Sequence, residues 1–252
     1  MFVFAQVSDI HIGQDREDGG AAAAERAWQV MAYLNELPGP IDAVLVTGDL
    51  ADHGLPGEYA EVAKILSSRH LVFTCPGNHD VREAYRQVLL GETGDGDAAI
   101  NRVHHLPGAT LVMCDSSIPG RDDGLLDHAT LMWLDETLTA APQDVPAFVC
   151  FHHPPLILHQ PMIDAIRLSG EQRLAEVLGR HRHVVAVLCG HAHTPAVSTF
   201  AGLPLVVAPG VVSTLRLPWE GDIDMDFGLP PMIAFHVLDD EWRLTTHFRV
   251  VG

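Results

Sequence analysis

Positively charged residues are scarce in this chain, and lysine is nearly absent. Fifteen lysines and arginines stand against 33 aspartates and glutamates in 252 residues, which gives a formal net charge of −18 at pH 7. Lys64 is the one lysine. A surface of this sign repels a long polyanion, because nucleic-acid binding needs cationic side chains that neutralise phosphates. We therefore expect no nucleic-acid polymer as a partner, and we expect arginine to make any cationic contact with an anionic ligand.

Long hydrophobic runs and a cysteine framework are also missing. Residues 1–7 are apolar but have no basic segment before Asp9, which is not typical of a secretory signal. The uncharged stretches 145–163 and 184–215 are interrupted by prolines and histidines, which a lipid-exposed helix tolerates poorly. We expect a soluble, cytoplasmic protein without a membrane partner. Four cysteines lie inside apolar runs and are expected to be buried, reduced thiols; they are Cys75, Cys114, Cys150 and Cys189.

The pattern of apolar residues predicts an α/β core. With 47% hydrophobic and 19% charged residues, the composition is that of a globular protein. Short apolar or β-branched runs predict buried strands at residues 3–7, 43–47, 71–75, 110–115, 147–151 and 184–188. Apolar residues three or four positions apart predict helices at 21–35, 58–67, 81–90, 129–138 and 171–180, the fourth capped by Asp127. Strand-like segments after His193 predict a second sheet that closes the other side.

Carboxylate, amide or imidazole side chains follow almost every predicted strand in the first two hundred residues. Because ligands gather outside the carboxyl ends of strands in open α/β sheets, we expect these clusters to meet. They are Asp9 and His11, Gly48-Asp49, Gly77-Asn78-His79-Asp80, His152-His153-Pro154-Pro155, and Gly190-His191-Ala192-His193.

The chemistry of these side chains indicates a metal centre. Carboxylates, one amide oxygen and neutral imidazoles form an O/N ligand set without thiolate, which suits Mn, Fe, Co or Zn. The set exceeds one tetrahedral site, and two divalent ions about 3.5 to 4 Å apart that share a carboxylate would use all of it. A hydroxide bridging such ions is a nucleophile at neutral pH, because the metals lower the pKa of bound water. We also expect the glycines before Asp49, Asn78 and His191 to allow sharp turns or close approach.

The ordered motifs D-x-H, GD, GNHD, HHPP and GHAH resemble those of the calcineurin-like metallophosphoesterase superfamily, over roughly the first 215 residues. SDIH at 8–11, TGDL at 47–50, PGNHD at 76–80 and the segments around Asp115-Ser116-Ser117, Gly124-Leu125 and Trp133-Leu134 are most similar to bacterial class III cyclic-nucleotide phosphodiesterases and related glycerophosphodiesterases. The resemblance implies one domain over residues 1–252, built as a four-layer αββα sandwich of two mixed sheets. It leaves open whether the chain forms a homodimer.

The resemblance also implies the roles of individual residues. One metal would be held by Asp9, His11, Asp49 and His193, and a second by the bridging Asp49 with Asn78, His152 and His191. His152 is preferred to His153 because the ligand histidine of such proteins stands two residues before a proline. His79 would face the phosphate and assist the leaving oxygen, and Asp80 would orient His79 or support a metal ligand. Asn78, His79 and Arg16 are the predicted substrate contacts, with Arg82, Arg121 and Arg216 as further candidates.

These motifs predict a dinuclear-metal hydrolase that cleaves small-molecule phosphodiesters of the cyclic-nucleotide or glycerophosphodiester type. The metal ligands alone do not separate this activity from that of a phosphomonoesterase or a nucleotide pyrophosphohydrolase. A non-catalytic scaffold with the same fold would be expected to lack some ligands, and none is missing here.

Overall fold

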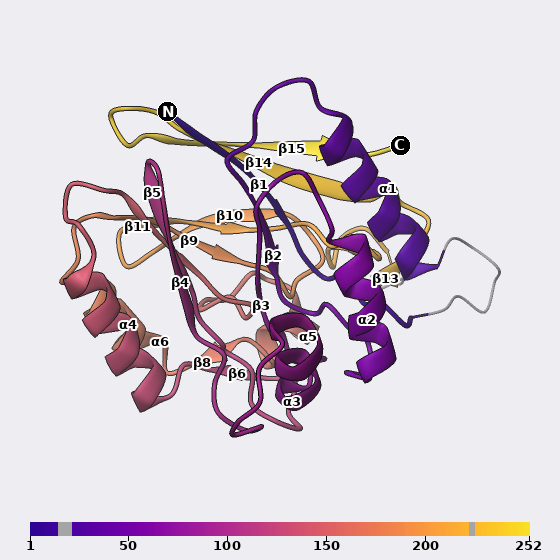
Figure 1. The fold of residues 1–252 in the computed structure, drawn as a ribbon, viewed down its shortest axis with the longest axis horizontal. Helices are drawn as coiled ribbons and strands as arrows, with labels where there is room; N and C mark the ends of the chain where they lie inside the picture. Colours follow the sequence, from indigo (N-terminus) through magenta and orange to yellow (C-terminus); the bar gives the residue numbers. More distant parts are fainter. Residues whose placement is uncertain (15–21, 222–224) are drawn as a thin grey trace.

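Two β-sheets pack face to face at the centre of the structure (Figure 1). The computed structural model describes residues 1–14, 22–221 and 225–252. The first sheet has the strand order β15-β14-β1-β2-β3, with bounds Leu244–Val250, Met232–Leu238, Phe2–Val7, Ala43–Thr47 and Val72–Cys75. The second has the order β10-β11-β9-β7-β5-β4, with bounds Ala196–Phe200, Leu203–Val207, Val184–Cys189, Ala147–Cys150, Ala109–Met113 and Arg102–Leu106. Two short pairs complete the strands, β12 (Thr214–Leu215) with β13 (Met225–Asp226) and β6 (Gly124–Leu125) with β8 (Leu168–Ser169).

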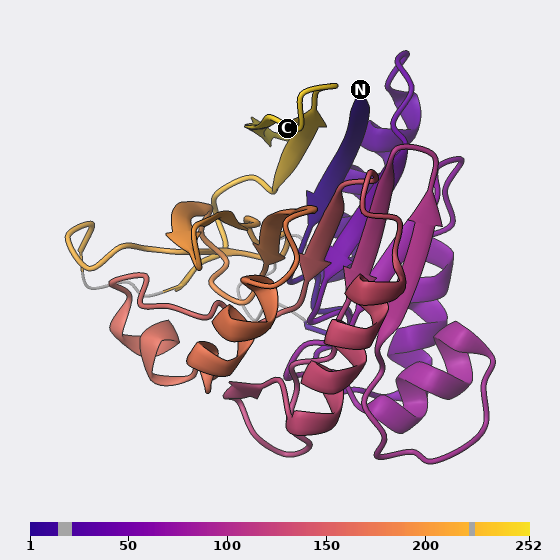
Figure 2. The same ribbon diagram turned by 90° about the vertical axis from the view of Figure 1, so that its left-hand side faces the viewer.

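Helices cover the outer face of each sheet, which confirms the predicted four layers. Helices α1 (Ala23–Glu36) and α2 (Pro56–Ile65) pack on the first sheet, and α4 (His128–Ala140) and α6 (Glu171–Leu178) pack on the second. In Figure 2, α4 lies in front of the strands while the purple helices lie at the right. The shorter helical elements are α3 (Arg82–Tyr85), the π-helical turn η1 (Arg86–Leu90) and α5 (Pro161–Ala165).

Apolar side chains fill the space between the sheets. Phe4 of β1 and Phe148 of β7 meet there with ring centroids 4.9 Å apart, and Leu45 of β2 belongs to the same cluster. Strands β2 and β7 are buried along their whole length, so they read as continuous apolar runs instead of alternating ones. Asp127 caps α4 as predicted, its carboxylate accepting a hydrogen bond from the amide of Thr130.

The parallel strands bring the polar clusters of the sequence to one edge. Strands β1, β2 and β3 run parallel in the first sheet, and β5, β7 and β9 run parallel in the second. Parallel neighbours end at the same edge of a sheet. Because the two sheets also face each other, the loops after β1, β2, β3, β7 and β9 converge at one end of the sandwich.

The prediction that the strand-like segments after His193 form the second sheet is wrong. Apart from the short pair of β12 and β13, the strands after His193 join the two main sheets: β10 and β11 extend the sheet of β9, whereas β14 pairs antiparallel with β1. Alternating burial shows that a strand is half buried but does not select the edge that it joins. The predicted helix 81–90 is also divided, into α3 and η1.

The four cysteines are free and buried, as expected. Among the described residues, no helix combines the length and the apolar character needed to cross a membrane.

Candidate metal centre

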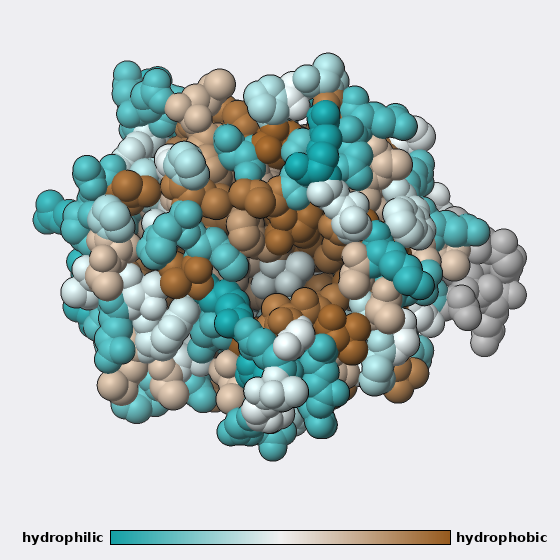
Figure 3. Space-filling model, in the orientation of Figure 1, coloured by the Kyte–Doolittle hydropathy of each residue, from teal (hydrophilic) through white to brown (hydrophobic). Residues whose placement is uncertain are grey.

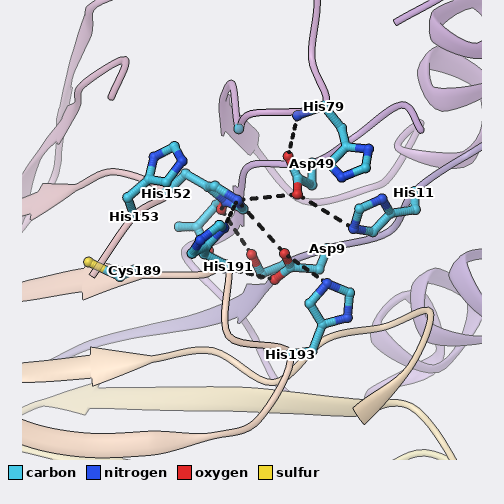
Figure 4. A network of polar contacts seen from close by, with 12 residues as sticks. Asp9, His11, Asp49, His79, His152, His153, Cys189, His191 and His193 are labelled. Atoms are coloured by element: carbon cyan, nitrogen blue, oxygen red, sulfur yellow. Dashed lines mark hydrogen bonds and ion pairs between the residues drawn. The ribbon is translucent and has the colours of Figure 1, made fainter. Parts of the chain in front are cut away.

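Five polar residues at the ends of the strands have left-handed backbone conformations. Their φ angles are 54° for Asp9, 43° for His11, 52° for Asp49, 71° for His191 and 53° for His193. This region is unfavourable for residues with a Cβ atom, and it persists only where the surroundings enforce it. Such strain concentrates at functional sites. Here it turns the backbone so that side chains from separate loops point toward one another (Figure 4).

Hydrogen bonds between the loops hold these conformations. The amide of Asp9 donates to the carbonyl of Gly48 at 3.1 Å, and the amide of His11 donates to the carbonyl of Asp49 at 3.0 Å. The amide of His191 donates to the Asp9 carboxylate at 3.1 Å. The loops after β1, β2 and β9 therefore form one rigid unit.

Among the described residues, the side chains form four overlapping groups of possible ligands, and two of these groups share Asp9. Possible ligand atoms of Asp9, His11 and His193 lie within 4.8 Å of one another, and so do those of Asp9, Asp49 and His152. The Asp49 Oδ2 atom lies 3.5 Å from His11 Nε2 and 3.3 Å from His152 Nε2. The Asp49 carboxylate thus stands between the two groups, which is the position required of a shared ligand.

A further group consists of His152, His153 and His191, and two of its imidazoles face each other. His191 Nδ1 lies 3.1 Å from His152 Nε2, and both side chains are buried. The Oδ1 atom of Asn78, in the loop after β3, is buried and accepts no hydrogen bond from the described residues.

Several buried polar atoms at this site have no hydrogen-bond partner among the described residues. Buried polar atoms are rarely left in that state, because each would lose its hydration without compensation. They are Asp9 Oδ1, His11 Nε2, Asn78 Oδ1 and His191 Nε2. A set of convergent oxygen and nitrogen donors without thiolate is the ligand chemistry of divalent Mn, Fe, Co and Zn. The residues present therefore fit a pair of such ions.

Three of the histidines are oriented from outside through Nδ1, which turns Nε2 toward the centre. Their partners are Asp52 Oδ1 for His11 at 2.9 Å, the Thr47 carbonyl for His152 at 2.7 Å and Ser213 Oγ for His193 at 2.8 Å.

The electrostatics of the site separate its histidines into two kinds. Burial lowers the pKa of His193 to about 4 and holds that of His191 well below its usual value. Burial also acts on His152, but the charge of Asp49 outweighs it and raises the pKa of His152 to about 9. The pKa of His11 is raised as well, because the hydrogen bond to Asp52 and nearby carboxylates overcome burial. A cluster of buried carboxylates thus attracts positive charge at this point.

Glycines leave the space that two of the predicted ligand side chains occupy. A Cβ atom on Gly48, whose φ is +94°, would lie 2.2 Å from His152 Nδ1. A Cβ atom on Gly77 would lie 2.2 Å from Asp49 Oδ1. The expectation of close approach holds at both positions, and what approaches the glycine is a side chain.

His79 lies at the exposed rim of the site. Its side chain is 41% exposed, its ring packs edge-on against His11 with centroids 4.6 Å apart, and its amide donates to Asp49 Oδ1 at 2.9 Å. Its Nδ1 atom donates to the carbonyl of Asp52 at 2.9 Å, which directs Nε2 away from the protein backbone.

Asp80 does not orient His79, contrary to one of the two roles predicted for it. Its carboxylate accepts hydrogen bonds from the amides of Leu50, Ala51 and Gly77 and from the Tyr59 hydroxyl. Burial and the charge of Asp49 raise the pKa of Asp80 to about 6. Asp80 therefore ties the loop after β2 to the loop after β3, and it supports the ligands through their backbone.

His153 lies beside the centre, with a ring nitrogen within 4.8 Å of ligand atoms of His152 and His191, but both of its ring nitrogens have other partners. Its Nδ1 atom pairs with Ser116 Oγ at 2.8 Å and its Nε2 atom with the carbonyl of Asp122 at 3.2 Å. Both ring nitrogens are used, whereas His152 Nε2 faces Asp49 (Figure 4). This geometry favours His152 over His153 as a ligand.

The arginines predicted as substrate contacts have carboxylate partners where the structure describes them. Arg16 lies outside the described residues. The other pairs are Arg82 with Asp115 at 2.8 Å, Arg121 with Asp123 at 2.7 Å and Arg216 with Asp226 at 2.6 Å.

Asp52 was not predicted as a site residue. It accepts the hydrogen bond from His11, lies 3.6 Å from His79 Nδ1, and has a pKa lowered mainly by His11 against the effect of burial. Its position three residues after Asp49 is the one signal in the sequence, because a tight turn there returns to the same side of the site.

Comparison with known proteins is consistent with this geometry. The family model described as calcineurin-like phosphoesterase matches residues 2–195. A probable cyclic nucleotide phosphodiesterase from Rhodococcus erythropolis is 34% identical over 220 residues, which cover 85% of this chain and 72% of that protein. A probable glycerophosphodiester phosphodiesterase from Arcobacter nitrofigilis is 29% identical over 265 residues, covering 99% of this chain and 93% of that protein.

Solved structures show the same fold. The crystal structure of a dimetal phosphatase from Danio rerio superposes with a TM-score of 0.73 over 100% of this chain and 96% of that chain, at 16% sequence identity. At this identity the likeness concerns the fold alone.

Proposed function

The chain belongs to the calcineurin-like phosphoesterase family, and from this premise we propose that it is a dinuclear-metal hydrolase of small-molecule phosphodiesters. The observation that carries the proposal is the set of unpartnered buried donors around the shared carboxylate of Asp49. The relatives described as cyclic nucleotide and glycerophosphodiester phosphodiesterases support a diester as the substrate.

The residues of the proposed site would divide into two ligand groups around Asp49. Asp9, His11 and His193 would hold one ion, and Asn78, His152 and His191 the other. Ions bound there would activate a water molecule as the nucleophile and neutralise charge on the phosphate group.

The protein itself would position the substrate and its protons. His79 is the proposed phosphate contact, because its Nδ1 atom is anchored to the carbonyl of Asp52 and its half-exposed ring borders His11. From this place the Nε2–H of its imidazolium form would either donate a hydrogen bond to a non-bridging oxygen or transfer its proton to the leaving oxygen, which would leave the ring neutral with Nδ1–H on the Asp52 carbonyl. Asp52 would fix His11 through the hydrogen bond to its Nδ1 atom.

The proposal is tested by replacing Asp49 and Asn78 separately, as Asp49→Asn and Asn78→Ala. We expect loss of bound metal by elemental analysis and at least a 100-fold fall in kcat/KM for bis(p-nitrophenyl) phosphate, because a ligand lost from a two-ion site disturbs both ions. Asp144→Asn, at an exposed position outside the site, is the matched control and should retain metal and activity.

The same assay separates the competing activities. A wild-type protein that cleaves p-nitrophenyl phosphate or nucleoside diphosphates faster than any diester would be a monoesterase or a pyrophosphohydrolase. Full metal loading without hydrolysis of any of these esters would identify a scaffold. Asp49→Asn with undiminished metal and turnover would refute the shared-ligand role.

A further inference from the structure

A cavity of about 460 Å³ opens between α5 and the segment that follows β12. Its walls come from residues 160–162 and 215–218, with Gly221 at the margin. We refer to it as the Gln160 pocket. Its volume lies within the range of about 300 to 1,000 Å³ that is usual for small-molecule sites.

A short stretch of the chain connects the wall of the Gln160 pocket with the candidate metal centre. The Thr194 hydroxyl, directly after His193, donates a hydrogen bond to the carbonyl of Leu215 in the pocket wall. Ser213, two residues before Leu215, contacts His193 Nδ1 at 2.8 Å. One continuous segment therefore orients a predicted metal ligand and lines the pocket. The pocket wall at Leu215 therefore lies two residues along the chain from the side chain that orients His193.

One polar side-chain atom of the residues that line this pocket has no hydrogen-bond partner among the described residues. Gln160 is 3% exposed, and its Nε2 atom is buried without a hydrogen bond. A side-chain amide offers donors and an acceptor in one plane. Because a buried amide without a partner is unfavourable, its presence in the wall of a cavity indicates a ligand that supplies the missing contact.

The remaining walls select the chemistry of that ligand. Pro161, Met162, Leu215 and Leu217 are apolar. Arg216 contributes the one charged side chain of the described lining, and Asp226 neutralises it through contacts of 3.0 and 2.6 Å. Because the charge of Arg216 is already neutralised, neither an anionic nor a cationic group of a ligand would be bound strongly by the described pocket walls. Apolar walls with a single planar amide suit a flat, neutral heteroaromatic ring with hydrogen-bonding groups on its edge.

On the space-filling view, hydrophobic residues gather in the middle of one face and hydrophilic residues surround them (Figure 3). In Figure 2 the gold loop that follows β12 extends to the left of the molecule and ends at the grey trace. The pocket wall formed by residues 215–218 belongs to this projecting part of the chain.

We propose that the Gln160 pocket binds the nucleobase of the phosphodiester substrate, and that Gln160 recognises the hydrogen-bonding edge of the base. This inference rests on the proposed phosphodiesterase function, and it selects cyclic nucleotides over glycerophosphodiesters. Glycerol is small and polar, so it would leave the apolar walls and the Gln160 amide without contacts.

Binding of adenosine to the metal-free protein tests the pocket without any turnover. Saturation-transfer NMR would measure its affinity for wild type, for Gln160→Leu and for Gln172→Leu, a matched control at an exposed position on α6. We expect Gln160→Leu to weaken adenosine binding about five- to tenfold, the effect of one lost hydrogen bond, and Gln172→Leu to leave it unchanged. Leu217→Trp, which fills the pocket, should abolish binding even if Gln160→Leu folds poorly.

Steady-state kinetics with the metal-loaded protein complete the test. For 3′,5′-cyclic AMP, Gln160→Leu should raise KM about five- to tenfold, and for glycerophosphocholine and bis(p-nitrophenyl) phosphate it should change KM less than twofold. Equal effects on all three substrates, a wild-type preference for glycerophosphocholine, or unchanged adenosine binding in Leu217→Trp would overturn the inference. In each of these cases hydrolysis of bis(p-nitrophenyl) phosphate would persist, whereas failure of the proposed function would remove it.

The cavity beside Asn78 is the rival location for the base. It measures about 290 Å³ and has acidic side chains, Glu83 and Asp97, in its lining. A Glu83→Trp variant that abolishes adenosine binding, together with an inert Leu217→Trp, would place the base there and overturn the assignment to the Gln160 pocket.

Discussion

Replacement of Gly77 by alanine should inactivate the protein without unfolding it. Gly77 does not have a left-handed backbone conformation, so alanine is acceptable there by its dihedral angles. The obstacle is the Asp49 residue: the new Cβ atom would lie 2.2 Å from Asp49 Oδ1, 2.5 Å from its amide nitrogen and 2.8 Å from its Cγ. The loop cannot retreat easily, because the Gly77 amide donates to Asp80 at 2.9 Å.

The size of the effect follows from this overlap. Contacts below 3.0 Å essentially never occur for a real Cβ atom, so Asp49 must move by roughly 1 Å. Overpacking of this kind costs about 1 to 3 kcal/mol of the free energy of unfolding, which a domain of ordinary stability tolerates. A 1 Å displacement of a group that positions reactants lowers the rate by about 100-fold. Activity should therefore fall far more than stability.

The assay compares Gly77→Ala with Gly57→Ala. An added Cβ atom on Gly57 meets nothing within 4 Å, and the residue lies in α2, so alanine there should raise stability by up to about 1 kcal/mol and leave kcat/KM unchanged. We would measure the melting temperature, the bound metal and kcat/KM for bis(p-nitrophenyl) phosphate. If Gly77→Ala keeps the metal content and kcat/KM of Gly57→Ala, the position of Asp49 against this loop does not determine activity and the reasoning is refuted.

Three further predictions concern the outer hydrogen bonds, the pH dependence of stability and the metal. Asp52→Asn should weaken metal binding about 10- to 100-fold, because His11 loses the carboxylate that orients it. Competition with a chromophoric chelator measures this affinity. An affinity equal to that of wild type would contradict the prediction. Burial lowers the pKa of His236 to about 3, so below pH 6.5 the unfolded state binds a proton that the native state does not, and the free energy of unfolding falls as the pH falls. Measured by urea unfolding, the loss of this free energy between pH 7 and pH 5 should be about 2 kcal/mol smaller in His236→Gln than in wild type. Equal losses in the two proteins would contradict the prediction. Removal of metal by chelation should lower the free energy of unfolding by about 4 kcal/mol if the free ion had been 1,000-fold above its Kd. The melting temperature should then fall by on the order of 10 °C. The melting temperature of Asp49→Asn should change little on chelation, because this variant is expected to have lost its metal already.

The site residues were predictable where their positions depend on strand ends. Asp9, Asp49 and Asn78 follow parallel strands, and parallel strands fix which edge the next residue occupies. Asp52 and Ser213 were not predictable in this way, because each reaches a histidine from a loop whose path no periodic pattern encodes. The main-chain carbonyl groups that accept hydrogen bonds from the histidines were also not predictable, because any residue supplies such a group.

The sheets were predictable in part. The parallel strands could be identified because burial on both faces makes them continuous apolar runs, as in β2 and β7. The pairing partner of β14 could not be identified, because its alternation of buried and partly buried residues fits any half-buried position at the edge of a sheet. Pairing with β1 depends on which backbone edge is left open after the parallel core has formed.

Under the two proposals, reaction chemistry and substrate choice belong to different parts of this fold. The predicted ligand side chains are held by strand register, by left-handed turns and by hydrogen bonds between loops, so a change at any of them would disturb the whole candidate centre. The Gln160 pocket instead lies between a five-residue helix and a loop beyond the two-residue strand β12, and the carbonyl of Leu215 joins it to the centre. Under the proposed nucleobase role, substitution of Gln160 would alter which phosphodiester is accepted while Asp49 and its partners keep their geometry. If the proposals hold, the substrate preference of this protein can be changed without loss of its metal.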